Sequence, residues 1–241
     1  MNPRPPNRDA APAAPTLSII LPVLNEAAGI ADTLRALAPL RAAGHEVIVA
    51  DGGSHDGTPA RCEGLADAVI AAPRGRARQM NAGAAVARGA VLLFLHADTQ
   101  LPAQADQLVL AAVGGGTAGQ PLWGRFDVRI AGRSAWFPVI ATLMNTRSRL
   151  SGIATGDQAL FVRREVFAAL GGFADQPLME DIELSHRLRR VSAPACLRAR
   201  VVTSGRRWEA HGVWRTIVLM WRLRLRYWLG ASPEVLVRLY R

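Results

Sequence analysis

The chain has 241 residues, half of them hydrophobic, which is enough for one large α/β domain with its own core. The net charge of +10, carried almost wholly by arginine, favours an anionic partner such as a nucleotide or a phospholipid surface. The arginines are scattered and no base-reading motif is present, so we expect no nucleic-acid partner. No hydrophobic run is long enough to span a bilayer, and the run 17–21 is too short for a signal peptide. These features predict a cytoplasmic protein.

The first half alternates short apolar runs with helical patterns. Residues 1–15 are rich in Pro and Ala and are expected to form a disordered tail, followed by one domain over 16–210. Expected strands cover 17–21, 46–50, 68–71 and 91–95, and expected helices follow them, opening at 25–26, near 58 and after the arginine-rich segment 74–78. This alternation predicts a mostly parallel sheet flanked by helices, in an α/β fold.

The second half is less regular. Strands are expected over 122–130, 159–162 and 195–202, and helices over 102–113, 135–150, 165–170 and 179–190, with a loop at 205–208. Pro22 is expected to stop the first strand, and Pro138 to interrupt the helix that contains it. The segment 211–241 is expected to form an amphipathic helix that packs on the domain or on a membrane surface.

Acidic side chains follow three of the apolar strands. Glu26, Asp51 and Asp98 each lie just beyond a strand, at the edge of the sheet where ligands collect in open α/β folds. An isolated aspartate in this position is usually a helix cap or a turn residue, and Asp98 could cap the helix expected to start near Pro102. Three such turns in succession could instead hold a nucleotide and a divalent metal ion.

The chain resembles family 2 glycosyltransferases with the GT-A fold. The segment S-I-I-L-P-V-L-N-E at 18–26 is similar to the opening strand and loop of that family, and D-G-G-S-H-D-G-T at 51–58 is similar to its D-G-S-x-D-G-T segment. His96-Ala97-Asp98 stands in the place of its D-x-D motif, Glu180-Asp181 in that of its E-D pair, and Arg207-Trp208 at the end of its Q-x-x-R-W motif. Within the family, the chain most resembles small bacterial enzymes often encoded beside radical-SAM and selenium-related domains.

The resemblance implies an inverting enzyme that makes a single addition from a nucleotide-diphosphate sugar to an acceptor hydroxyl. It implies that Asp98, with His96, binds Mn²⁺ or Mg²⁺ and that Asp181 is the general base, with Glu180 beside it. It also implies a nucleotide pocket lined by Pro22, Asn25, Glu26 and Asp51. On the acceptor side, it implies contacts from Arg207 and Trp208. Arg76 and Arg78 could clamp the diphosphate or form a solvated basic face, and Asp157 could contact the acceptor or simply shape a turn.

Two features leave alternatives open. His96 replaces the first acid of D-x-D, so it could ligate a metal, contact the donor phosphate or only form hydrogen bonds. On the C-terminal helix, one stripe holds Trp214, Ile217, Val218, Trp221, Leu225 and Trp228. Such a stripe usually faces a core, but a Trp-rich basic helix could also contact anionic lipid at the inner face of the membrane, which would suit a lipid-linked acceptor.

Two other functions compete with glycosyl transfer. A sugar-phosphate nucleotidyltransferase has a related sheet, but the glycine-rich loop with lysine that we expect after its first strand is absent from residues 21–26. A degenerate transferase that binds nucleotide sugars without turnover is the second alternative. The sequence does not identify the donor sugar, the base or the acceptor.

Overall fold

A computed structural model describes residues 16–115 and 119–240, so the predicted tail 1–15 lies outside the described residues. The strands are β1 (Leu17–Val23), β2 (Glu46–Asp51), β3 (Ala68–Ala71), β4 (Val91–Phe94), β5 (Thr99–Gln100), β6 (Trp123–Ala131), β7 (Phe161–Arg163) and β8 (Ala195–Ser204). They form one sheet in the order β3-β2-β1-β4-β7-β6-β8-β5. Strands β3, β2, β1 and β4 are parallel to one another. Strand β7 runs antiparallel to its neighbours β4 and β6, and β6 pairs with β8 in parallel. The predicted mostly parallel α/β sheet is confirmed.

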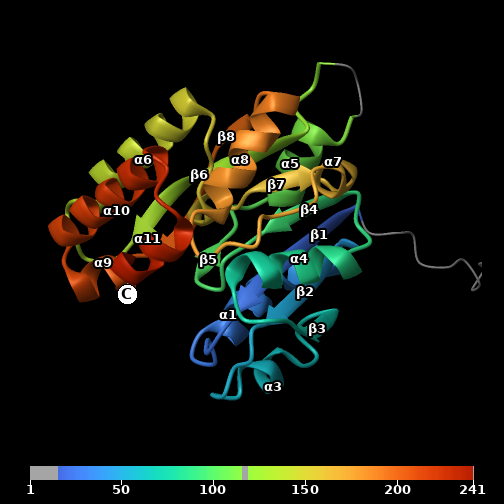
Figure 1. Cartoon of the computed structure of the whole chain (residues 1–241). Coiled ribbons are helices and arrows are strands. Elements are labelled where there is room, and N and C mark those ends of the chain that lie inside the picture. The colour runs from blue at the N-terminus through green and yellow to red at the C-terminus, as the bar shows by residue number, and fades with distance from the viewer. Residues whose placement is uncertain (1–15, 116–118, 241) are drawn as a thin grey trace, which may run out of the picture.

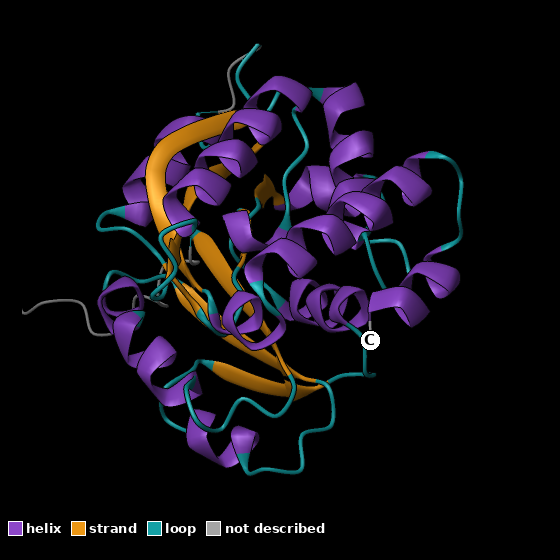
Figure 2. Ribbon diagram, turned by 90° about the vertical axis from the view of Figure 1, so that its left-hand side faces the viewer, coloured by secondary structure: helices purple, strands orange, loops and turns teal. Residues whose placement is uncertain are grey.

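Helices cover both faces of this sheet (Figures 1 and 2). They are α1 (Ile30–Ala36), α2 (Ala38–Ala42), α3 (Thr58–Cys62), α4 (Arg76–Val86), α5 (Ala105–Val113), α6 (Phe137–Ser151), α7 (Arg164–Ala169), α8 (Glu180–Val191), α9 (Arg206–His211), α10 (Val213–Trp228) and α11 (Pro233–Tyr240). A single 3₁₀ turn spans Gly156–Gln158.

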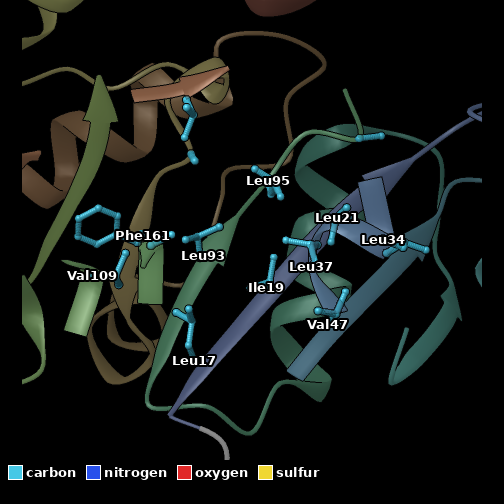
Figure 3. Close-up of a cluster of buried hydrophobic side chains, with 14 of the residues drawn as sticks. Leu17, Ile19, Leu21, Leu34, Leu37, Val47, Leu93, Leu95, Val109 and Phe161 are labelled. Atoms are coloured by element: carbon cyan, nitrogen blue, oxygen red, sulfur yellow. The ribbon is translucent and has the colours of Figure 1, made fainter. Parts of the chain in front are cut away.

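The strands bury both faces because their side chains alternate between two hydrophobic clusters. One cluster takes the odd-numbered residues of β1, β2 and β4 and packs them against α1 and α5 (Figure 3). The other takes Ile20, Ile48 and Leu92 and packs them against α4, α7 and α8. Helix α4 approaches β1 closely at Gly83, where a Cβ would lie 2.5 Å from Ile20 Cγ2. This rigid centre fixes the loops that follow β1 and β4.

Both expectations about proline are wrong. Pro22 lies inside β1, paired with Ala50 of β2. Its nitrogen faces the β4 side of the strand, and β4 has already ended at Phe94, so no ladder hydrogen bond is lost there. Pro138 lies in the first turn of α6 and does not interrupt it, because the first helical amides have no intrahelical partner.

Two expected helix starts also lie elsewhere. The first helix begins at Ile30, since Asn25 is left-handed (φ 55°) and the amide of Glu26 donates to Thr58 Oγ1. Asp98 is followed by β5, and α5 begins only at Ala105, so Asp98 does not cap that helix.

The C-terminal segment folds as two helices, α10 and α11, at one end of the molecule beside α6 (Figure 1). The loop expected at 205–208 is wrong, because residues 206–208 belong to α9. Leu223 and Leu236 are buried against Ile153, Leu178 and Ile182, whereas Trp221 and Trp228 are 68% and 79% exposed. Most of the predicted apolar stripe therefore faces away from a core, because α10 buries the neighbouring face that carries Leu223; only Ile217 of the stripe packs against a buried cluster. No helix among the described residues has the length and apolarity to cross a membrane.

A buried carboxylate joins the amino ends of β1 and β2 to the loop before β4. Glu46 accepts hydrogen bonds from Ser18 Oγ and from the amides of Arg88 and Gly89. Burial alone would raise the pKa of Glu46, but these hydrogen bonds outweigh burial and hold the pKa below its ordinary value. The ionised form is thus the one that the fold stabilises.

We expect Glu46→Gln to lower the free energy of unfolding at pH 7 by about 1–3 kcal/mol. The stabilisation is present above the unfolded-state pKa of about 4.3 and is lost as the pH falls through the lower folded-state value. The gap between wild type and variant in urea unfolding should therefore narrow with acidification. Glu63→Gln, at an exposed site, is the control and should change little. A gap that stays constant down to pH 3 would contradict this role.

Candidate functional site

Two cavities lie beyond the carboxyl ends of β1 and β4. The edge cavity, of about 350 Å³, is lined by Pro22, Glu26, Gln79, Pro177 and the loop at 74–76, among others. The central cavity, of about 280 Å³, is bounded by residues from β8, α8, α10 and the 3₁₀ turn. Both are lined by the same three side chains, Arg76, His96 and Asp98. A ligand in the edge cavity could thus reach a second ligand in the central cavity across these residues.

Two carboxylates share one guanidinium at this junction. Arg206 Nη2 lies 3.8 Å from Glu26 Oε2 and 3.8 Å from Asp98 Oδ2. Burial raises the pKa of Glu26, and the nearby charge of Asp98 raises it further, while Arg206 acts in the opposite direction. The site concentrates negative charge in a place that a cation would stabilise.

His96 faces the 3₁₀ turn. Its Nδ1 lies 3.5 Å from Asp157 Oδ1, and a Cβ at Gly156 would lie 2.5 Å from its Nε2. Burial would raise the pKa of Asp157, but the hydrogen bond and charge of His96 lower it below its ordinary value. Metal ligation by His96 stays a prediction.

The Glu180-Asp181 pair begins α8 and lines the central cavity. Asp181 Oδ2 accepts from the Gly156 amide at 2.8 Å, and its Oδ1 from the Ile182 amide at 2.8 Å. Glu180 is buried and pairs with Arg76 at 3.4 Å. Burial raises the pKa of Glu180, partly offset by Arg76, and the charge of Asp181 raises it again. Asp181 is therefore the carboxylate that backbone amides fix toward the cavity, and Glu180 is held by Arg76.

The other residues predicted from the sequence divide into two groups. Asp157, Arg207 and Trp208 line the central cavity. Asn25, Asp51 and Arg78 line neither of the two cavities among the described residues, and each is engaged elsewhere. Asn25 and Asp51 accept hydrogen bonds from amides of the 53–55 loop, and Arg78 pairs with Asp175 at 2.7 Å. Their roles in nucleotide binding stay predictions.

Sequence reasoning missed three residues of the site. The sequence predicts a loop at Arg206, which pairs with Asp98, and it predicts only an amphipathic helix at Arg224 and Tyr240. Arg224 and Tyr240 both line the central cavity. The signal for Arg224 is its position: it departs from the exposed stripe of α10 and lies next to buried Leu223. Nothing local in the sequence marks Tyr240, which the turn at 229–232 returns to the site.

In residues 16–115 and 119–240, no cluster of three or more His, Cys, Asp or Glu side chains could hold a metal ion alone. The residues nevertheless fit a divalent metal of the Mg²⁺ type, which is commonly bound by one or two carboxylates together with substrate phosphates. Asp98 offers such an oxygen at the junction of the two cavities, with Glu26 nearby.

The family model of glycosyl transferase family 2 matches residues 18–171. The chain therefore belongs to glycosyl transferase family 2, and its sheet and helices form the GT-A fold. This match favours glycosyl transfer over the nucleotidyltransferase alternative. No curated protein matches the chain.

Solved structures of glycosyltransferases share this fold. A mannosyltransferase from Pyrobaculum calidifontis, solved with GDP-Man and Mn²⁺, is 24% identical over 80% of this chain and 59% of its own, with a TM-score of 0.57. TarS 1-349 from S. aureus, solved with UDP-GlcNAc, is 17% identical over 78% of this chain and 58% of its own, with a TM-score of 0.62. Glucosyl-3-phosphoglycerate synthase from Mycobacterium tuberculosis, solved with Mg²⁺ and UDP, is 21% identical over 78% of this chain and 70% of its own, with a TM-score of 0.56. The chain thus spans about three fifths of the length of the first two.

Proposed function

We propose that the protein is an inverting glycosyltransferase that moves one sugar at a time from a nucleotide-diphosphate sugar to an acceptor hydroxyl. The carrying observation is the junction of the two cavities at Arg76, His96 and Asp98, with the Asp181 carboxylate lining the central cavity. The donor diphosphate belongs at this junction and the acceptor in the central cavity. The structures solved with GDP-Man or UDP-GlcNAc support a donor of this class.

In this proposal, one set of residues acts on the leaving group and another on the nucleophile. Asp98, with Glu26 beside it, would hold Mn²⁺ or Mg²⁺, and the bound ion would neutralise charge on the departing diphosphate. Asp181 takes the acceptor proton as the acceptor oxygen bonds to the anomeric carbon and the bond from that carbon to the diphosphate oxygen breaks. Two backbone amides hold the Asp181 carboxylate in place in the first turn of α8. Arg76, which lines both cavities, places a cation at the junction where the diphosphate would bind.

A panel of nucleotide sugars tests this function directly. Incubation with Mn²⁺ or Mg²⁺ should release nucleoside diphosphate from one donor class even without an acceptor, since water can replace the acceptor hydroxyl. Binding of a nucleotide sugar without any turnover would instead support the degenerate, non-catalytic alternative.

We further propose that the face formed by α6 and α10 contacts a membrane surface. Trp214, Val218, Trp221, Leu225 and Trp228 are exposed on α10, Val139, Leu143 and Leu150 are exposed on α6, and Trp136 is exposed just before α6. Trp136 stacks edge-on against Trp214 at 4.8 Å, which joins the two helices into one apolar face. Exposed arginines at 215, 222 and 226 lie on the same α10 helix and would attract anionic headgroups.

Sedimentation with anionic liposomes at low salt should recover the wild-type protein in the pellet. The double variant Leu225→Ser, Trp228→Ser should lose most of this binding, because both side chains are exposed on the apolar face. Val86→Ser, at an exposed valine on the distant α4, is the matched control. Wild-type protein that stays in the supernatant, and forms a dimer by light scattering, would assign the face to a second copy.

A further inference from the structure

An apolar groove runs between α6 and α10 and leads into the central cavity. It measures about 280 Å³, and its apolar lining comes from Ile140, Leu143 and Met144 on α6 and from Ile217, Met220 and Trp221 on α10. The groove and the central cavity have five lining residues in common: Met144, Asp157, Trp208, Met220 and Arg224. At its outer side, Leu143 and Trp221 also belong to the exposed apolar face. The groove thus connects that face with the cavity that contains Asp181.

Two arginines interrupt this apolar lining. The Nε and Nη2 atoms of Arg147 are buried and have no hydrogen-bond partner among the described residues. Arg224 faces the same groove from α10. Burial, and after it the charge of Arg224, lowers the pKa of Arg147 to about 10, while the charge of Asp181 acts in the opposite direction. Two partly buried guanidinium groups that line one groove are costly unless an anion binds near them.

The nearby carboxylates are occupied with other groups. Asp157 pairs with His96, and both oxygens of Asp181 accept backbone amides. In the part of the chain that the structure describes, neither Arg147 nor Arg224 forms an ion pair within 4 Å. A structural ion pair therefore does not account for the two arginines, and a ligand of opposite charge would satisfy their donors.

We propose that the groove binds an amphiphilic acceptor, with its anionic phosphate headgroup on Arg147 and Arg224 and its apolar chain along Leu143 and Trp221. This inference rests on the proposed function, because it assigns the acceptor class to the same site. A headgroup on the two arginines lies at the entrance to the central cavity, which is where an acceptor has to reach Asp181. The chain continues toward the exposed apolar face, so the acceptor would enter from a lipid surface.

Calorimetric titration with decyl phosphate below its micelle concentration tests the proposal. We expect saturable binding with one site, weaker binding of decanol and of inorganic phosphate, and none of decyltrimethylammonium. Arg147→Met and Arg224→Met should each weaken decyl phosphate binding about tenfold or more, since each removes a charge-assisted contact. Arg61→Met, at an exposed arginine of α3, is the matched control and should bind like wild type.

Other results overturn the proposal. If decanol bound as tightly as decyl phosphate, the groove would recognise only the apolar chain. If inorganic phosphate bound as tightly as decyl phosphate, the groove would be a site for free phosphate. Arg147→Met removes a buried charge without a partner, so its melting temperature should stay or rise. A marked fall would show that the guanidinium supports the fold instead.

Donor hydrolysis on the same samples separates this inference from the proposed function. Nucleotide-sugar turnover without decyl phosphate binding overturns the acceptor class alone. Decyl phosphate binding in a protein that hydrolyses no nucleotide sugar overturns the transferase function, and with it the role of the groove as an acceptor site.

Discussion

Asp181→Asn is expected to lower metal-dependent donor hydrolysis and sugar transfer about 100-fold or more, with nucleotide-sugar affinity within a few-fold of wild type. The amide has nearly the same shape as the carboxylate but cannot accept the acceptor proton. The carboxylate lines the central cavity, away from the edge cavity in which we place the nucleotide, so donor binding should survive. Steady-state kinetics with calorimetric binding of the nucleotide sugar gives both quantities.

The substitution also changes a local hydrogen bond, so its effect on stability has to be distinguished from its effect on catalysis. An asparagine at 181 keeps one acceptor for the amides of Gly156 and Ile182, so a loss of about 1–3 kcal/mol in unfolding free energy is expected. Assays at a temperature well below the melting transition remove that effect. Asp175→Asn, at an exposed carboxylate paired with Arg78, is the control. Turnover within a few-fold of wild type would move the base to another residue, with Glu180 first.

Much of the fold could be predicted from the sequence because the first half follows simple rules. Apolar runs such as 91–94 can be buried only in a sheet covered on both faces, and short links between strands and helices impose parallel pairing. The expectations fail where tertiary contacts override local preference. Pro22 continues β1 because its neighbouring strand has ended, and α1 starts late because the 54–58 loop takes the amides of residues 25–27.

A residue of the candidate site could be predicted where its neighbours in the sequence also indicate where it lies in the fold. Asp98 follows an apolar run, which predicts its place at the sheet edge, whereas Asp181 is identified only by the resemblance of Glu180-Asp181 to the E-D pair of the family. Arg147, Arg206 and Arg224 were not assigned, because their relevance depends on how α6, α9 and α10 pack. The same limit applies to the stripe of α10: periodicity identifies an apolar face but does not decide which face the core covers.

Asp98→Ala should abolish metal-dependent turnover and leave the fold intact. The residue follows β4 and lies at the junction of both cavities, and no structural hydrogen bond depends on its side chain among the described residues. Its one described ion pair, with Arg206 at 3.8 Å, is half-exposed and contributes little to stability. Removal of the carboxylate takes away the oxygen that would hold Mn²⁺ or Mg²⁺ against the diphosphate. Without that ion, charge on the leaving group is no longer neutralised.

Titration of Mn²⁺ in the presence of the nucleoside diphosphate, followed by paramagnetic resonance, separates loss of the metal from loss of the fold. Asp98→Asn should weaken this ternary binding as the alanine variant does, because a neutral amide oxygen is a poorer ligand for a hard cation. Asp32→Ala, which removes an exposed carboxylate paired with Arg35, should bind the metal like wild type. Metal-dependent turnover that persists in both Asp98 variants would rule out this residue as the ligand. In that case Glu26, which shares Arg206 with Asp98, is the next carboxylate to test.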